Sequence, residues 1–303
     1  MSDFTWSVDT EKGERIDKFI AKQEPDFSRS RLQALIEDGS ILVNGCIVKS
    51  NYKLRAHDVI TADLKADEPL EAKPENIPLD IIYEDEDVIV INKPKGMVIH
   101  PSAGNREHTL VNALLYHCRD LSGINGVLRP GIVHRIDKDT TGLIAAAKND
   151  KAHRSLAKQL ADKTMNRTYL ALVHGVLEHD YGTIDAPIGR DEKDRQRMTV
   201  TAKNSKNAIT HFKVIERFQE HTLVECQLET GRTHQIRVHM QYIKHPLVND
   251  PKYGYRRDEG GQMLHACALT FVHPKTLEVM RFEAPLPEAF EKVLEELRAR
   301  EDL

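Results

Sequence analysis

A charged segment punctuated by prolines, between residues 63 and 78, constrains the fold of this 303-residue chain more than any other feature. It has no apolar periodicity, so neither a helix nor a strand is expected there. Proline lacks the amide donor and restricts the residue before it, which makes such a segment semi-extended. We therefore predict two modules, residues 1–62 and 79–303, joined by a linker at 63–78.

The first module is predicted to be a small α/β unit. Two amphipathic helical patterns come first, and Gly39 is a typical end for the second. An Asn-Gly pair at 44–45 then lies between β-rich stretches and predicts a hairpin with a tight turn.

Basic residues gather in this first module. Residues 28–55 contain five basic side chains and two acidic ones, and Arg29 and Arg31 stand at the start of the second helical pattern. Cations at the positive end of a helix dipole are poorly placed for stability and well placed to bind phosphates. A run of charge by itself more often marks a solvated helix face, so both interpretations stay open at this point.

The second module shows strand patterns interrupted by a few helices. An acidic turn at 84–87 separates two apolar strand patterns and predicts a hairpin. Further strand patterns occur at 168–173, 211–216 and 223–229, and helical patterns occur at 110–120, 152–163 and 287–298. Because strands and helices do not alternate regularly, we predict an α+β fold with a mixed or antiparallel sheet and peripheral helices.

Composition narrows the classes of partner. Hydrophobic residues make up 40% of the chain, enough for a core in each module. The net charge of -4 argues against a generic polycation, so a nucleic acid would have to meet a local basic surface. The four cysteines are scattered, which indicates reduced thiols and a cytoplasmic protein. We see neither a signal peptide nor a membrane-spanning run, and we expect no membrane partner and a monomer.

The segment Gly131-Ile-Val-His-Arg-Ile-Asp-Lys-Asp-Thr-Thr-Gly142 is the strongest indication of a functional site. Its apolar beginning is typical of the end of a strand, and the polar residues after Asp137 are typical of a tight turn. An aspartate there more often hydrogen-bonds its own turn, but a turn has no use for His134 and Arg135 just upstream. Asp137 is therefore predicted to lie where a strand delivers side chains into a cleft.

Two further stretches carry groups that suit a site. Lys93 and Lys95 stand in a loop shaped by glycine and proline, and the loop is equally typical of a sheet edge with solubilising lysines. Tyr169 opens a strand pattern, a position at which a tyrosine usually packs in the core with its hydroxyl satisfied.

The segment Gly231-Arg-Thr-His-Gln-Ile-Arg-Val-His239 places an arginine, a hydroxyl and an imidazole at an expected helix start. His234 and His239 are five residues apart, so on a helix they do not share a face, and no carboxylate or thiol completes a set of metal ligands. We therefore expect no metal there. Neither a dinucleotide-binding fingerprint nor a phosphate-binding loop occurs in the chain, so we expect no cofactor.

Together these stretches resemble the RluA-type family of RNA pseudouridine synthases. Residues 134–137 resemble the family's His-Arg-Leu-Asp signature, with Ile136 in place of leucine, and residues 231–239 match its second motif at every position. The first module resembles the small S-four-like RNA-binding module. The resemblance covers the chain from about Glu14 to its C-terminal helical pattern, and it implies the pseudouridine synthase fold for the second module.

The resemblance also implies roles for the motif residues. Asp137 is implied to be the catalytic residue, and Arg237 is implied to be its ion-pair partner. An arginine suits that place because it cannot lose its proton beside a buried carboxylate. Tyr169 is implied to stack on the target base, with a late proton abstraction as a further option. Arg135 is implied to enter the RNA as the base leaves. The residues expected to contact RNA are Arg135, His134, Lys93, Lys95, Arg232, His234, Arg29 and Arg31.

The activity implied by the resemblance is conversion of uridine to pseudouridine in RNA, which consumes no redox equivalent and needs no metal. The overall arrangement is most similar to family members that act on a stem-loop of 23S large-subunit ribosomal RNA, and the partner is therefore expected to be that RNA or a pre-ribosomal particle. Two other functions stay open. One is an RNA-binding ribosome assembly factor without chemistry, and the other is a metal-independent hydrolase that uses Asp137 with His134.

Overall fold

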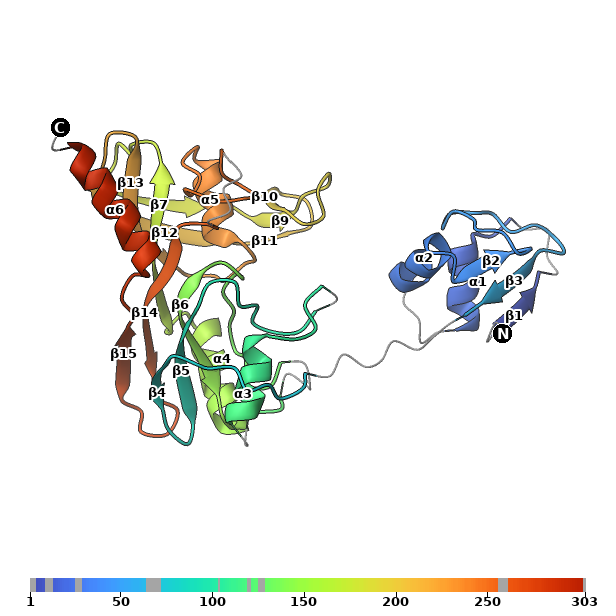
Figure 1. The fold of residues 1–303 in the computed structure, drawn as a ribbon, viewed down its shortest axis with the longest axis horizontal. Helices are drawn as coiled ribbons and strands as arrows, with labels where there is room; N and C mark the ends of the chain where they lie inside the picture. The colour runs from blue at the N-terminus through green and yellow to red at the C-terminus, as the bar shows by residue number, and fades with distance from the viewer. Residues whose placement is uncertain are drawn as a thin grey trace. The chain divides into compact units, whose positions relative to one another are not determined.

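The structure is a computed structural model, and it describes residues 4–8, 13–24, 29–63, 72–102, 104–118, 121–124, 129–255 and 261–301. The chain divides into two compact units, Met1–Pro69 and Leu70–Leu303 (Figure 1). Each unit has a hydrophobic core of its own. None of the helices in the described ranges combines the length and apolar character needed to cross a membrane.

The N-terminal unit packs two helices against a three-stranded antiparallel sheet. Its elements are β1 (Phe4–Ser7), α1 (Ile16–Gln23), α2 (Arg29–Glu37), β2 (Ile41–Val43) and β3 (Val59–Ala62), with strand order β1-β3-β2. Both predicted helices are confirmed. The Asn-Gly turn forms, but the predicted hairpin across it is wrong. Only one bridge, between Val43 and Cys46, joins the two sides of the turn, and β2 pairs with β3 instead. Burial decides this pairing, since Ile60 on β3 is fully buried whereas Ile47 is 66% exposed.

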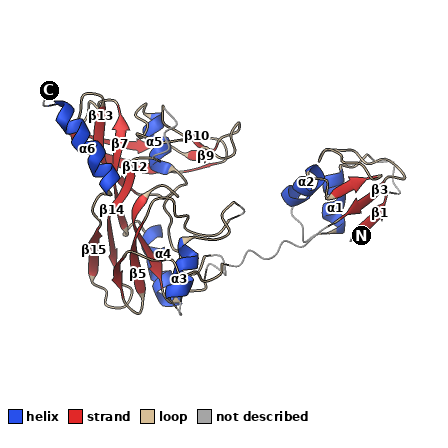
Figure 2. Ribbon diagram, viewed as in Figure 1, coloured by secondary structure: helices blue, strands red, loops and turns tan. Residues whose placement is uncertain are grey.

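The second unit is built mainly from strands, with helices at its surface (Figure 2). Its strands are β4 (Ile81–Glu84), β5 (Val88–Lys93), β6 (Thr141–Ala147), β7 (Asn166–His174), β8 (Tyr181–Asp185), β9 (Ile188–Arg190), β10 (Met198–Val200), β11 (Ser205–Lys206), β12 (Ile209–Arg217), β13 (His221–Leu228), β14 (Leu264–Val272) and β15 (Val279–Glu283). Its helices are α3 (Leu110–His117), α4 (Asp150–Ala161), α5 (Gln235–Tyr242) and α6 (Glu288–Glu301).

Nine of these strands form one sheet in the order β4-β5-β6-β14-β7-β13-β12-β8, with β15 paired to β14. The pair β6 and β14 is parallel and the other pairs are antiparallel, so the sheet is mixed and the predicted α+β class is confirmed. Gly142 makes the parallel pairing possible. It has a φ of 105°, and a Cβ at this position would lie 2.2 Å from the carbonyl oxygen of Ala266.

Helices cover both faces of the large sheet. The buried side chains of α3 and α5 join one core, together with Tyr169 of β7 and with Val224 and Cys226 of β13. On the opposite face α4 packs over β5 and β6, and α6 packs over Leu223 of β13. Side chains of β13 are therefore buried on both faces, Val224 and Cys226 in the first core and Leu223 against Phe290 of α6 in the second.

The described half of the predicted linker, residues 72–78, is fastened to the second unit. The side-chain amide of Asn112 on α3 donates to the carbonyl of Lys73 at 2.7 Å, and the amide of Glu75 donates to the carbonyl of Asn112 at 2.9 Å. Residues 64–71 lie outside the described ranges. The predicted boundaries of the two modules and of the linker therefore stay predictions.

Candidate active site

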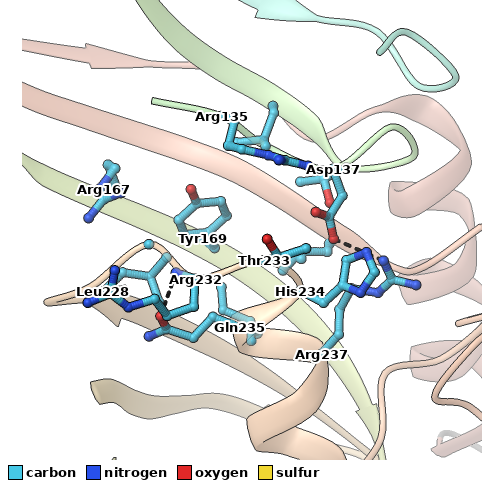
Figure 3. Close-up of a pocket in the computed structure, with 15 residues that line it drawn as sticks. Arg135, Asp137, Arg167, Tyr169, Leu228, Arg232, Thr233, His234, Gln235 and Arg237 are labelled. Carbon is cyan, nitrogen blue, oxygen red and sulfur yellow. Dashed lines mark hydrogen bonds and ion pairs between the residues drawn. The ribbon is translucent and has the colours of Figure 1, made fainter. Parts of the chain in front are cut away.

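A pocket of about 460 Å³ opens where the segment before β6 meets β7 and the start of α5 (Figure 3). These elements come from three distant parts of the chain. The charged and aromatic side chains that line the pocket are Arg135, Asp137, Arg167, Tyr169, Arg232, His234 and Arg237.

Asp137 reaches this pocket from an extended segment and a turn. Ile132 makes one bridge to Ala146 of β6, the chain then runs without regular structure, and a turn at residues 138–139 leads into β6. The prediction that Asp137 follows the end of a strand is therefore wrong, because the strand comes after the aspartate. Ile136 anchors the segment in the core, which leaves Asp137 16% exposed at the pocket.

His134 holds this segment from the inside. Its Nε2 accepts a hydrogen bond from the amide of Ala145 on β6 at 3.0 Å, and the side chain is buried. Burial, with a smaller contribution from the charge of Arg167, lowers the pKa of His134 to about 3, so the ring is neutral at pH 7. The expectation that His134 contacts RNA is corrected on this ground. The same contacts turn the neighbouring Arg135 outward, where it is exposed.

Lys93 is also an interior group. It is fully buried, and its Nζ donates to the carbonyls of Pro94 and Lys138 at 2.7 and 2.9 Å. Burial lowers the pKa of Lys93 to about 7. The expected phosphate contact is therefore corrected, because Lys93 fixes the turn beside Asp137 instead. Lys95, two residues further on, is exposed and accessible to a ligand.

Arg237 lies at the closed end of the pocket between two carboxylates. Its Nη1 donates to Oδ2 of Asp137 at 2.9 Å, so the ion pair implied by the motifs is present across 100 residues of sequence. Its Nε and Nη2 donate to the two oxygens of Asp250 at 2.7 and 2.8 Å. Asp250 is fully buried, and the backbone amides of Lys252 and Tyr253 donate to it as well.

This arrangement keeps the guanidinium charged. Burial by itself lowers the pKa of Arg237, but the hydrogen bonds and charges of Asp250 and Asp137 outweigh it and raise the pKa above its usual range. Burial would likewise raise the pKa of Asp250, and Arg237 more than offsets it, so that pKa is lowered. Asp137 therefore faces a cation that cannot be neutralised and that is already fixed in position by a second carboxylate.

Tyr169 forms a wall of the pocket from β7. It is 5% exposed and its ring is part of the core, as expected of a tyrosine at a strand start. Burial raises the pKa of Tyr169, so its hydroxyl is protonated at neutral pH. Figure 3 shows Asp137 on one side of this ring and Arg167 on the other.

His234 and Tyr253 support the floor of the pocket. His234 precedes α5 with a left-handed backbone (φ 58°), and its Nδ1 lies 2.8 Å from the hydroxyl of Tyr253. Burial lowers the pKa of His234 to about 4, so any contact with RNA would be made by a neutral ring. The ring of Tyr253 also lies under the guanidinium of Arg237, at 5.1 Å from its centroid.

The remaining predicted contact residues are spread over both units. Arg232 lines the pocket, is partly exposed, and donates from Nε to the carbonyl of Asn207 at 2.9 Å. Arg29 in the N-terminal unit is exposed and pairs with the buried carboxylate of Asp17 at 2.9 Å. The side chain of Arg31 lies outside the described part of the structure.

Sequence reasoning missed Asp250, Tyr253 and Arg167. Asp250 stands in an Asn-Asp-Pro stretch that is typical of an ordinary turn, so only its burial against Arg237 reveals its place. Two groups of potential metal ligands occur among the described residues, one around Glu84 and one around Asp85. Neither group contains a residue that lines the pocket.

Comparison with known proteins decides the family. The sequence profile described as RNA pseudouridylate synthase matches residues 87–242, and the S4 domain profile matches residues 14–60. The chain belongs to the RNA pseudouridine synthase family. Enzymes of this family are isomerases, and the mixed sheet with few helices is the pseudouridine synthase fold, here with an S4 domain at the N-terminus.

Several relatives of this pseudouridine synthase align over most of its length. An uncharacterized RNA pseudouridine synthase of Bacillus subtilis is 60% identical over 95% of both chains. A protein of Zymomonas mobilis named ribosomal large subunit pseudouridine synthase D is 45% identical over 91% of both chains. The solved structure of human RNA pseudouridylate synthase domain containing 1 is 25% identical, with a TM-score of 0.57 over 74% of this chain and 96% of that chain.

Proposed function

We propose that this enzyme isomerises a uridine in a stem-loop of 23S large-subunit ribosomal RNA, and that Asp137 carries the chemistry. The observation that supports it most is the ion pair of Asp137 with Arg237 inside the pocket. The choice of RNA is supported by relatives named for the large ribosomal subunit, at 41 to 45% identity over most of the chain. We further propose that the enzyme is a cytoplasmic monomer and that it assists ribosome biogenesis. Its substrate would be free ribosomal RNA or a pre-ribosomal particle.

The reaction breaks the bond from N1 of uracil to C1′ of ribose and forms a bond from C5 to C1′. The proton leaves C5 and N1 gains one, so the composition of the nucleotide does not change. An ionised carboxylate at the junction of sugar and base can assist either as a nucleophile or as a base. Asp137 is the group we assign to this task, because it lines the pocket and the guanidinium of Arg237 holds its carboxylate in place.

The target base must leave its stack before it reaches Asp137. Unstacking and unpairing a nucleotide cost a few kcal/mol. We assign Arg135 to the space that the base vacates, because it is exposed and points away from the buried His134. The ring of Tyr169 gives the flipped base a surface to stack on. Arg232, His234 and Lys95 remain proposed contacts to the RNA around it.

We propose that the N-terminal unit binds a part of the RNA other than the reacting nucleotide. Arg29, Lys49, Lys53 and Arg55 are exposed on this unit, and with Arg31 they account for the excess of positive charge in residues 28–55. Two modules on one RNA raise the effective concentration of the target at the pocket. This favours a large structured RNA over a short oligonucleotide. The proposed limits are 1–62 for the RNA-binding module and 79–303 for the catalytic one.

The test uses large-subunit ribosomal RNA transcribed in vitro with tritium at C5 of uracil. Tritium release measures loss of the C5 proton, and mapping of pseudouridine identifies the site. Small-subunit ribosomal RNA and transfer RNA serve as controls for the substrate, and Asp137→Ala serves as the control for the site.

Release from the large-subunit RNA alone, lost in Asp137→Ala while RNA binding persists, is the expected result. Unaltered RNA that stays bound would favour an assembly factor without chemistry, and cleaved RNA would favour a hydrolase. Tritium release from transfer RNA instead would support an isomerase but contradict ribosomal RNA as its substrate.

A further inference from the structure

Arg167 is a buried cation for which the described residues provide no ion-pair partner. It stands on β7 two residues before Tyr169, it is 8% exposed, and its Nε finds no hydrogen-bond partner among the described residues. Two other lysine or arginine side chains are buried in the described ranges. Lys93 donates to two carbonyls, and Arg237 donates to two carboxylates.

The acidic groups around the pocket are already engaged elsewhere. Asp137 pairs with Arg237, and Glu229 pairs with Lys163 and His211. No described carboxylate forms an ion pair with Arg167. A largely buried guanidinium without an anion is unfavourable, since its Nε is cut off from water and gains no hydrogen bond in exchange. A ligand that enters the pocket can supply the missing anion.

The surroundings of Arg167 have room for such a ligand. Arg167 lines the pocket of Asp137 and also an adjoining groove of about 910 Å³, and Arg135 and Arg232 lie on this shared border. Gly231 lets the guanidinium approach, because a Cβ there would lie 2.7 Å from Nη1 of Arg167. Lys163 adds another cation to the groove.

We propose that Arg167 binds a backbone phosphate of the substrate RNA, next to the nucleotide whose base lies on Tyr169. This inference rests on the proposed function of the pocket. Alternate residues of a strand point to the same face and are about 6–7 Å apart, so a nucleotide stacked on Tyr169 has its backbone within reach of Arg167. The planar fork of a guanidinium binds two phosphate oxygens at once.

The experiment compares Arg167→Gln and Arg167→Lys with Arg154→Gln. Arg154 is exposed on α4 and lines neither the pocket nor the groove, so its replacement removes one charge from the same unit. Tritium release gives KM and kcat on the ribosomal RNA. Thermal unfolding is followed with and without inorganic phosphate at constant ionic strength, which tests anion binding without any RNA.

Arg167→Gln is expected to raise KM about 10- to 100-fold relative to Arg154→Gln, with kcat at saturating RNA within about threefold, and Arg167→Lys is expected to recover part of the KM. The slope of log affinity against log salt should fall by about 0.7 to 0.9. The free variant should melt at the wild-type temperature or above, because a desolvated charge has been removed. The rise in melting temperature caused by phosphate should be smaller in Arg167→Gln than in Arg154→Gln.

The inference is overturned if Arg167→Gln and Arg154→Gln have the same KM, or if Arg167→Gln melts well below the wild type, which would mark a structural arginine. Failure of the proposed function is distinguishable from this. In that case the wild type releases no tritium from ribosomal RNA, and the phosphate-dependent melting still decides whether Arg167 binds an anion.

Discussion

Arg237 and Arg167 are both buried and line the same pocket, yet their surroundings differ. Arg237 is held by Asp137 and Asp250 through three hydrogen bonds of 2.7 to 2.9 Å. Arg167 has no such partner in the described part of the chain. At one end of the pocket the buried arginine is paired with carboxylates of the protein itself, and at the other end the buried arginine lacks such a pair among the described residues.

The difference separates two tasks. A group that assists bond breaking gains from dipoles and charges that are fixed in advance, because nothing then has to reorganise during the reaction. A group that captures a substrate gains from a charge that only the substrate can satisfy, even though this lowers the stability of the free protein. The Arg237 end suits the first task and the Arg167 end suits the second.

The largest effect is expected for Arg237→Gln. The change leaves Asp137 and Asp250 facing each other without a cation, and breaking a buried ion pair from one side costs about 3–5 kcal/mol of stability. Tritium release should fall at least about a thousandfold, because Asp137 loses the cation that holds its carboxylate in position. Urea unfolding and single-turnover release measure the two effects. Stability equal to that of the wild type would contradict the closed arrangement at this end.

Asp250→Asn should have the next largest effect. The amide keeps the shape of the side chain but removes the charge that fixes Nε and Nη2 of Arg237. Residues that orient the ligands of a metal contribute about 10- to 100-fold to activity, and by analogy we expect Asp250→Asn to lower kcat in that range with little change in KM. Asp17→Asn is a suitable control, because Asp17 is a fully buried, arginine-paired aspartate of the other unit. A loss confined to KM would place Asp250 in RNA binding instead.

A smaller effect is expected when three exposed cations of the N-terminal unit, Lys49, Lys53 and Arg55, are changed together to glutamine. We expect KM to rise about tenfold at moderate salt and the salt slope of RNA affinity to fall by about 2 to 3, with kcat unchanged. Steady-state release at several salt concentrations measures all three quantities. A fall in kcat at saturating RNA would show that these cations affect the reaction itself.

The smallest expected effect is on pH dependence. Burial and then the charge of Arg167 lower the pKa of His134 from 6.5 to about 3. The unfolded chain takes up this proton near pH 6.5 and the folded chain does so only near pH 3, so stability decreases as the pH falls through this range. Arg167→Gln removes one of the two causes, and its stability should decrease less than that of the wild type between pH 7 and 4. Identical pH dependence in urea unfolding would contradict the closeness of the two side chains.

The parts of the fold that follow local rules could be predicted from the sequence. The hairpin of β4 and β5, the helices α4 and α6 and the mixed sheet follow from periodicity and turn residues. The pairing of β2 could not be predicted, because it depends on which strand buries its side chains against the helices. The parallel pairing at Gly142 also could not, since it depends on a backbone contact with Ala266, 124 positions later.

The residues of the candidate site also fall into those that could be predicted from the sequence and those that could not. Asp137 could be singled out because its neighbours His134 and Arg135 have no use in a simple turn, whereas the role of Arg237 was implied only by the resemblance to the family. The RNA contacts predicted for Lys93 and His134 are wrong, because the sequence shows the chemistry of these side chains but not that they are buried. Arg167 could not be predicted, because an arginine near the start of a strand is common and only its buried, unpaired Nε sets it apart.

The most direct test of the central claim is single-turnover tritium release by Asp137→Asn, with enzyme in excess over large-subunit ribosomal RNA. The side chain keeps its shape and its hydrogen bond acceptor toward Arg237 but has no charge. We predict release at least about a thousandfold slower than in the wild type, with RNA affinity within about threefold. Release near the wild-type rate would contradict the assignment of the reaction to the carboxylate held by Arg237.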